Sequence, residues 1–387
     1  MRFLARALGL VAALGATAGC RRSGSAPVAV SSDGAASPAA TRAEPRRFHR
    51  IDVHTHIGPD GIPRAVRLMN EWGIDGAVNL SGMFPGPPRG LLEMQLAAAN
   101  APAGGGRIAV FMTPNFKLVR AVKNYGEAMA AELAEGQRLG ARGLKITKGL
   151  GLGIPAPDGK HLLAVDDPGL DPLFERAGAL GMPVAIHIGD PKAFWKPVSP
   201  DNERWDELRV HPEWSFYGPG IPSWQALYDA FERLVARHKK TTFIGVHFGN
   251  DPEDPDNVAR MLDKYPNLYV DTAARVPEIG RHPQEKMRRF YAKYQDRVLF
   301  GTDTGIGPDD ADMMYGSTGA DVPTRADEVR FFTSTWRYFE TSDRQFESPT
   351  PIQGRWKIDG VGLPESVLRK IYFENAARVL RWRPPGT

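Results

Sequence analysis

Two histidines separated by a single residue, His54 and His56, are the first feature of this sequence that could carry out chemistry. Side chains alternate between the two faces of a β-strand, so both imidazoles and Asp52 are predicted to point the same way, with Ile51 and Val53 facing a layer of helices. Two imidazoles at this spacing can occupy adjacent corners of a tetrahedral metal site, but two ligands do not complete one. Histidines that only make hydrogen bonds near a strand end are the alternative interpretation.

Three later strand-like segments end in residues of the same chemistry, namely His187, His247 and Asp303. In the second segment the alternation predicts that His247 points inward above Gly245, and in the third Asp303 is in phase with Leu299. Four of the chain's nine histidines therefore fall on inward positions at strand ends. Buried histidines without a ligand would each need a hydrogen-bond partner, so this gathering favours a metal site over a set of core histidines.

The elements that position these residues are strand-like segments that alternate with helix-like segments along the chain. The strand candidates are 49–57, 75–81, 107–113, 141–148, 183–189, 241–248, 267–273 and 297–303. The helix candidates are 62–72, 91–101, 118–139, 171–180, 223–239, 255–264, 283–294 and 325–340. This alternation favours an α/β fold of the (β/α)8 TIM-barrel type over an open doubly wound sheet. Active sites in such barrels lie at the C-terminal ends of the strands, where the histidines and the aspartate are predicted.

The N-terminus of the chain has the composition of an export signal. Residues 1–19 combine two arginines with a short apolar stretch, which predicts a signal peptide and not a membrane-spanning helix. Cys20 follows a small residue as in a bacterial lipobox, which predicts a lipid anchor in the periplasm, with plain secretion as the alternative. Residues 20–45 are poor in large apolar side chains and are predicted to be a flexible tether. Residues 46–387 form the predicted barrel domain.

The composition of the chain limits the partners that we expect. Its 387 residues carry a formal net charge of +4, and lysine and arginine are scattered along the sequence. Nucleic acid is therefore not an expected partner. A small-molecule substrate is expected instead, and the membrane is expected to be contacted only through the N-terminal lipid anchor. The single cysteine excludes a disulfide within the chain.

Three other residues could contribute to a site at the strand ends. Lys145 is predicted to turn inward on the fourth strand, where it could pair with a carboxylate such as Asp271. Arg275 follows the seventh strand and could hold a substrate carboxylate in fork geometry, or could pair with the acidic loop after the sixth strand. Trp195 belongs to a long connection after the fifth strand, which could act as an aromatic-lined lid or could use its aromatic residues only to pack itself down.

The order of these residues resembles the amidohydrolase superfamily, and within it the amidohydrolase-related (amidohydrolase 2) branch. The resemblance rests on His54-x-His56 on the first strand, His187 on the fifth, His247 on the sixth and Asp303 on the eighth. It extends from about residue 50 to the C-terminus, where residues 371–378 are similar to the closing helix of that branch. The set is specific for the superfamily but not for a substrate.

The resemblance implies one divalent ion, with Zn²⁺ expected and Mn²⁺ or a second metal as alternatives. The ligands would be His54, His56, His187 and Asp303. Asp303 would also be the general base towards a metal-activated water, while His247 would hydrogen-bond the reacting oxygen or give a proton to the leaving group. In binuclear relatives a carboxylated lysine on the fourth strand bridges two metals, so Lys145 and His247 would join the ligands of a binuclear site.

The function implied by the resemblance is that of a metal-dependent hydrolase, which acts on a small molecule through metal-activated water. The branch also includes non-oxidative decarboxylases, so decarboxylation of an aromatic or unsaturated carboxylic acid is the alternative. A third hypothesis is a periplasmic ligand-binding lipoprotein with a structural metal, although structural sites are usually closed by four tight ligands. Barrel enzymes of this branch often pair, so a homodimer is a further expectation.

Overall fold

A computed structural model describes residues 48–84 and 91–387 of the chain. The predicted signal peptide at 1–19, the predicted lipid attachment at Cys20 and the predicted tether at 20–45 lie outside the described residues and stay predictions. Within the described part, no helix combines the length and the apolar character that crossing a membrane requires.

Ten strands form one sheet in the order β10, β9, β1, β2, β3, β4, β5, β6, β7 and β8. The eight barrel strands are β1 (Ile51–Ile57), β2 (Gly76–Asn79), β3 (Ile108–Met112), β4 (Gly143–Ile146), β5 (Val184–Ile186), β6 (Phe243–Gly245), β7 (Leu268–Asp271) and β8 (Val298–Leu299). Each pairs in parallel with the next. Every one of them lies within a segment that the sequence predicts as a strand.

The barrel closes between β8 and β1 through the chain that follows β8. The N–H of Val53 donates to the carbonyl of Phe300 at 2.9 Å, and the N–H of Asp303 donates to the carbonyl of His54 at 2.8 Å. The chain continues as β9 (Thr304–Ile306), which pairs in parallel with β1, and returns as β10 (Met314–Tyr315), which is antiparallel to β9. The predicted (β/α)8 TIM barrel is therefore confirmed.

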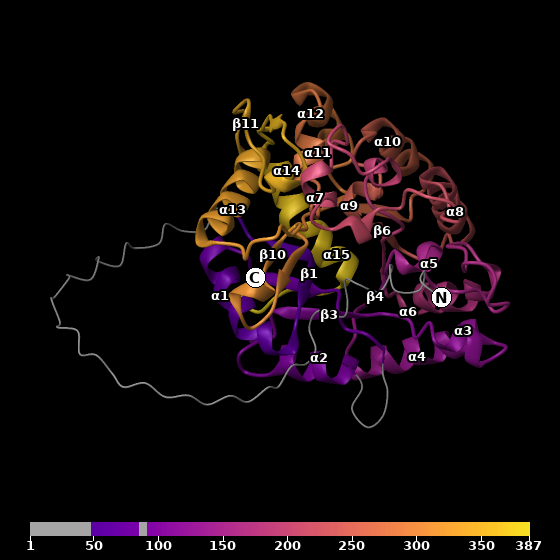
Figure 1. Cartoon of the computed structure of the whole chain (residues 1–387). Coiled ribbons are helices and arrows are strands. Elements are labelled where there is room, and N and C mark those ends of the chain that lie inside the picture. Colours follow the sequence, from indigo (N-terminus) through magenta and orange to yellow (C-terminus); the bar gives the residue numbers. More distant parts are fainter. Residues whose placement is uncertain (1–47, 85–90) are drawn as a thin grey trace, which may run out of the picture.

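Helices surround the strands, as Figure 1 shows. The longer ones are α1 (Ile62–Trp72), α2 (Leu91–Asn100), α4 (Tyr125–Leu139), α6 (Asp171–Leu180), α8 (Trp224–Arg237), α10 (Pro255–Lys264), α12 (Gln284–Lys293) and α13 (Arg325–Glu340). Short helices and strands lie between them: α3 (Leu118–Ala121), α5 (Gly149–Leu152), α7 (Trp205–Leu208), α9 (Val246–Gly249), α11 (Val276–Gly280), α14 (Glu365–Arg369), α15 (Asn375–Leu380), β11 (Phe346–Glu347) and β12 (Lys357–Ile358). The predicted helix 118–139 is thus split into α3 and α4.

Apolar side chains form two clusters, one between the strands and the helices and one inside the barrel. Val184 and Ile186 of β5 belong to the outer cluster, and Ala185 between them belongs to the inner cluster. The inner cluster also contains Ala376 and Leu380 of α15, so this last helix covers the barrel interior from one end. Figure 1 shows α15, in yellow, next to the strands.

The predicted alternation is wrong in the first half of β1 because the strand contains a bulge. The register of β1 against β2 shifts between Asp52 and Thr55, which is what an extra residue in one strand produces. Ile51 and Val53 consequently belong to the inner apolar cluster and not to the helix-facing layer. Asp52 lies beside residues of α1, on the opposite side of the strand from the two histidines.

The predicted phase of β6 is also wrong. A Cβ atom added to Gly245 would lie 3.3 Å from the ring of Phe231 in α8, so Gly245 faces outward, while Ile244 belongs to the inner cluster. His247 nevertheless reaches the interior, because His247 and Phe248 adopt the left-handed conformation with φ of 55° and 59°. This conformation is uncommon for residues with a Cβ, and here it turns the chain sharply after β6.

Candidate metal centre

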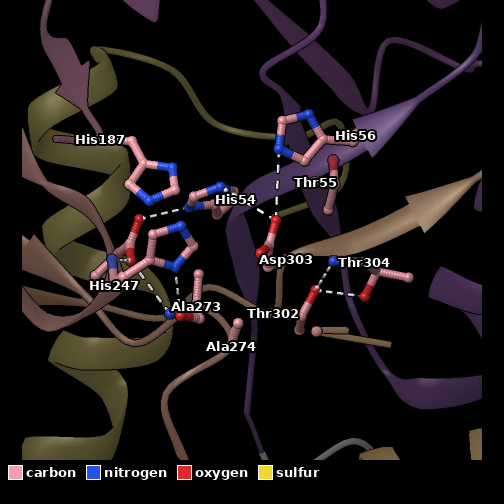
Figure 2. A network of polar contacts seen from close by, with 12 residues as sticks. His54, Thr55, His56, His187, His247, Ala273, Ala274, Thr302, Asp303 and Thr304 are labelled. Atoms are coloured by element: carbon pink, nitrogen blue, oxygen red, sulfur yellow. Dashed lines mark hydrogen bonds and ion pairs between the residues drawn. The ribbon is translucent and has the colours of Figure 1, made fainter. Parts of the chain in front are cut away.

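His54, His56 and Asp303 converge at the C-terminal end of the barrel strands, as Figure 2 shows. Nε2 of His54 lies 3.3 Å from Oδ1 of Asp303, and Nε2 of His56 lies 3.4 Å from the same oxygen. The histidines belong to β1, and Asp303 follows β8 in the left-handed conformation with φ of 63°. Because the N–H of Asp303 donates to the carbonyl of His54, the closure of the barrel brings the carboxylate to the histidines.

These separations fit three corners of one metal polyhedron. With metal–ligand bonds of about 2.0–2.2 Å, neighbouring ligand atoms of a tetrahedral site lie roughly 3.3–3.6 Å apart. Nε2 of His54 is buried and has no hydrogen-bond partner among the described residues, which is costly unless a ligand binds this nitrogen. Imidazole and carboxylate suit zinc and manganese. The residues present therefore fit a divalent ion.

Asp271 lies at the end of β7 and holds the other ring nitrogen of His54. Its Oδ2 accepts from Nδ1 of His54 at 2.9 Å, and its Oδ1 accepts from the backbone N–H of His247 at 2.8 Å and of Ala273 at 3.1 Å. Asp271 also falls in a group of possible ligand atoms with His54 and His247, but its oxygens already accept these three hydrogen bonds. Donation from Nδ1 selects the tautomer in which Nε2 of His54 carries the lone pair.

Replacing Asp271 with asparagine is expected to weaken metal binding by about 10-fold to 100-fold, because the orienting partner of a ligating imidazole is lost. Competition with a chromogenic chelator measures this affinity. Asp251→Asn is a matched control, since Asp251 is also a buried carboxylate but is bonded to Lys192 and Asn257. An equal loss of affinity in both variants would contradict the orienting role of Asp271.

His187 and His247 lie on the other side of His54 from His56 in Figure 2. The ring of His247 is centred 4.9 Å from that of His54 and 4.4 Å from that of His187. The structure thus brings all four predicted histidines into one cluster. The tight group around Asp303 contains His54 and His56 but not His187, so the fourth ligand stays a prediction.

Each of these two histidines has one ring nitrogen bonded to a backbone carbonyl. Nδ1 of His247 donates to Ala273 at 2.9 Å, and Nε2 of His187 donates to Gly189 at 3.1 Å. A carbonyl oxygen can only accept, so these bonds define the tautomers. In the neutral rings, Nε2 of His247 and Nδ1 of His187 carry the lone pairs.

The environment keeps the four histidines neutral, which is the form that binds a metal. Desolvation by burial is the largest cause that lowers the pKa of these side chains, and the positive charge of Lys145 lowers the pKa of each further. A neutral imidazole keeps its lone pair at neutral pH. The cluster is therefore prepared for metal binding without a change of protonation.

Lys145 of β4 turns inward, as predicted, and is only 2% exposed. Its Nζ has no hydrogen-bond partner among the described residues, so the alternative pairing with Asp271 is not formed. Burial lowers the pKa of Lys145 to about 8, although the charges of Asp271 and Asp303 act in the opposite direction. The amine therefore faces both carboxylates without a direct contact.

Arg275 stands between β7 and α11 and is 6% exposed. Its guanidinium donates to the carbonyl of Ala274 at 3.1 Å. It forms no ion pair with a carboxylate in the described part of the chain, so the alternative prediction of a salt bridge to the acidic loop after β6 is wrong. Its charge lowers the pKa of His54, His187 and His247, which places the guanidinium near the histidine cluster.

Trp195 lies beside the histidine cluster in the long connection after β5. Its Nε1 donates to the carbonyl of Pro222 at 2.9 Å, and its ring is centred 4.6 Å from that of Phe216. A Cβ atom added to Gly189 would lie 2.8 Å from the Trp195 ring. The carbonyl of Gly189 also accepts the hydrogen bond from His187. In space, Gly189 therefore lies between the tryptophan ring and that histidine.

Buried ion pairs fix this connection against the barrel. Arg204 is 1% exposed and pairs with Glu207 at 3.2 Å and with Glu278 of α11. On the surface, Asp206 pairs with Arg355 at 2.6 Å. Removing one partner of a buried pair costs about 3–5 kcal/mol, so the connection is held in place. Of the two alternatives for the long connection, these ion pairs favour a segment that is packed against the barrel. They do not favour a lid that opens freely.

Sequence reasoning missed the supporting carboxylates. Asp52 accepts from the backbone N–H of Thr302 at 3.0 Å, from its hydroxyl at 2.6 Å, and from the N–H of His54 at 3.1 Å. Burial raises the pKa of Asp52 to about 7. Asp52 thus links Thr302, the residue before Asp303, to the backbone of His54. It does so from the side of β1 that faces away from the metal centre. The Asp-x-His-x-His spacing was the available signal, but strict alternation gives Asp52 the wrong face.

The chain matches one family model in the comparison with known proteins. Residues 51–382 match the model of the amidohydrolase family Amidohydro_2. No curated protein matches the chain significantly.

Several solved structures resemble the fold at low identity. A 2,6-dihydroxybenzoate decarboxylase complexed with 2,6-dihydroxybenzoate is 16% identical with a TM-score of 0.48, over 87% of this chain and 100% of that one. A dihydroxybenzoic acid decarboxylase from Polaromonas sp. JS666, with bound manganese and the inhibitor 2-nitroresorcinol, is 15% identical with a TM-score of 0.48. The match covers 86% of this chain and 97% of that one. An amidohydrolase from Burkholderia multivorans with bound HEPES is 14% identical with a TM-score of 0.46, and the match covers 86% of this chain and 99% of that one.

The family match covers the whole barrel, from the start of β1 to the residues after α15. It therefore includes every residue of the histidine cluster and the two carboxylates beside it, Asp271 and Asp303. On this match the chain belongs to the amidohydrolase family, whose enzymes use a divalent metal.

Proposed function

We propose that this protein is a metal-dependent hydrolase that cleaves a small molecule bearing a carboxylate. The observation that carries the proposal is the convergence of Nε2 of His54 and Nε2 of His56 on Oδ1 of Asp303, at 3.3 and 3.4 Å. His187 is proposed as a further ligand. One divalent ion, Zn²⁺ or Mn²⁺, suits this set of nitrogen and oxygen donors.

A bound divalent ion lowers the pKa of water towards neutrality, which makes hydroxide available at working pH. Asp303 accepts the proton of the attacking water, since its side chain is 14% exposed and lies where His54 and His56 meet. The leaving group receives the proton that Asp303 took from the water, and Nε2 of His247, whose lone pair can first accept that proton, relays it. Its Nδ1 bond to the carbonyl of Ala273 keeps the ring in that orientation.

Arg275 supplies the recognition of the substrate carboxylate. A buried guanidinium without a carboxylate partner is costly, and a bound anion removes that cost. The planar fork can bind both oxygens of a carboxylate, which also fixes the orientation of the substrate. Trp195 and Phe216, which pack together beside the cluster, give the bound molecule an apolar wall.

Arg275→Lys is expected to raise KM for a carboxylate-bearing substrate by about 10-fold to 150-fold, with a smaller change in kcat. A hydrogen bond to a charged group contributes about 1.5–3 kcal/mol, and lysine cannot reproduce the fork. Steady-state kinetics measure both constants. Arg281→Lys is the matched control, because Arg281 lies at the other end of α11 and pairs with Glu203 on the surface. A loss confined to kcat would contradict substrate recognition by Arg275.

The proposed function is tested by offering the metal-loaded protein two substrate classes, carboxylate-bearing lactones and amides, and aromatic carboxylic acids. Acid release and carbon dioxide release are followed in parallel. Acid release without carbon dioxide is expected. Carbon dioxide from aromatic acids would replace hydrolysis with the decarboxylase alternative. Binding of these acids without turnover of either class would favour the ligand-binding hypothesis.

A further inference from the structure

We propose that the face of the barrel opposite the candidate metal centre docks onto anionic phospholipid headgroups. This surface, the basal face, is defined by Arg142, Lys239, Lys240 and Arg381, which lie in the turns before the strands and in the chain after α15. The proposal is independent of the reaction catalysed at the metal centre. It concerns how the protein sits in its surroundings.

The basal cations come from separate segments that the barrel brings together. Arg142 directly precedes β4, and Lys239 and Lys240 stand in the turn before β6. In a parallel barrel all such turns lie at the N-terminal end of the strands. Arg381 follows α15, and a Cβ atom added to Gly181, in the turn before β5, would lie 2.8 Å from its guanidinium. The four cations therefore surround the starts of β4, β5 and β6.

The positive charge of the basal face is not neutralised locally. All four side chains are exposed, and none has an ion-pair partner among the described residues. Asp263 and Asp296, exposed near the same end of the barrel, are paired with lysines at 2.9 and 3.0 Å. Glu175 and Glu374 are exposed and have no such pair. Even so, unpaired cations outnumber unpaired carboxylates here, and Arg383 adds a further positive charge.

The N-terminal segment enters the barrel at this same face. The ring of His49, which precedes β1, is centred 5.5 Å from that of Phe373, and Phe373 belongs to the inner cluster with α15. The predicted lipid anchor at Cys20 lies 28 residues before Phe48. The tether predicted from the sequence would span on average about 30 Å at that length. A lipid anchor would thus hold the basal face within reach of the membrane surface.

Anionic phospholipid is the partner that fits these observations best. A membrane surface is broad and negatively charged, and attracts each nearby lysine or arginine independently of detailed shape. With the basal face on the membrane, the metal centre points away from it, because it occupies the C-terminal ends of the strands. Docking and substrate entry therefore do not compete.

Vesicle co-sedimentation tests the proposal on the chain from residue 46 onward, which contains the closed barrel and both apolar clusters. Binding is expected to vesicles that contain phosphatidylglycerol, but not to vesicles of phosphatidylcholine alone. The triple variant Arg142→Glu/Lys239→Glu/Lys240→Glu is expected to bind at least about 100-fold more weakly, since each cation near an anionic surface contributes roughly fivefold and the new carboxylates are repelled by the surface. Binding is expected to vanish at 1 M salt, where the Debye length is about 3 Å.

The matched control is Lys117→Glu/Lys123→Glu/Lys196→Glu, which reverses three exposed cations that follow β3 and β5. It is expected to lose less than about threefold at 0.1 M salt, where charges separated by more than about 10 Å are screened. If the basal triple variant does not fold, Lys239→Gln/Lys240→Gln replaces it, with an expected loss of about 25-fold. Equal losses at both ends, no dependence on phosphatidylglycerol, or tighter binding to duplex DNA than to vesicles would each overturn the proposal.

Discussion

Asp303→Asn is expected to lower the turnover of any accepted substrate by about 10²-fold to 10⁴-fold, the range that positioned acid–base groups contribute. The amide can no longer take a proton from water, but its carbonyl oxygen can still serve as a ligand where Oδ1 now stands, next to Nε2 of His54 and of His56. Metal content should therefore fall much less than activity. Metal analysis and initial rates on the same preparation measure the two effects separately.

Asp309→Asn is the control for this substitution. Asp309 lies six residues further along the same connection, is exposed, and its backbone N–H donates to Oδ2 of Asp312 at 3.3 Å. Its removal should leave turnover unchanged. Unchanged turnover in Asp303→Asn, with metal still bound, would contradict the general-base role and would support a metal that is only structural.

The eight barrel strands could be predicted from the sequence because each is a short apolar run followed by a helix-like segment. For parallel strands that are buried on both faces, the sequence shows clearly which residues form the strand. It shows poorly which side chains point into the barrel, since both faces are apolar. The phase was accordingly wrong in β6, where Ile244 faces inward. In β1 the bulge reversed the faces of Ile51 and Val53.

The histidine cluster could be predicted in spite of these phase errors because it lies just beyond the strand ends. His247 and Asp303 are carried inward by left-handed turns and not by strand alternation. What the sequence could not provide is the pairing between distant segments. Asp271 is 217 residues from His54 along the chain, and their hydrogen bond depends on the closed barrel. No local pattern marks such a partner.

Lys145→Met is expected to stabilise the metal-free protein by about 3 kcal/mol at pH 7, because a buried amine without a hydrogen-bond partner is replaced by an apolar side chain of similar length. Residues kept at such a cost are typical of functional sites. Unfolding by urea measures the change. Lys148→Met is the control, since Nζ of Lys148 pairs with Asp190 at 2.5 Å and its loss should not stabilise the fold.

The pH dependence gives this prediction its sign. The pKa of Lys145 is lowered from 10.5 in the unfolded chain to about 8 in the folded protein. Below pH 8 the amine is protonated in both states, so the folded protein bears the full cost of the buried charge. Between about pH 8 and 10.5 the unfolded chain holds more protons, so the stability of the natural protein rises with pH. The advantage of Lys145→Met should therefore be largest at pH 7 and small at pH 10.

Metal content per chain then separates the two possible roles of this lysine. One metal ion in both the natural protein and Lys145→Met would mean that the amine acts by its charge in a mononuclear site, where it helps to keep the histidines neutral. Two ions, falling in Lys145→Met, would mean a carboxylated lysine that bridges a binuclear centre. In that case the natural protein loaded with metal would be the more stable of the two, since binding to the folded state alone adds to stability.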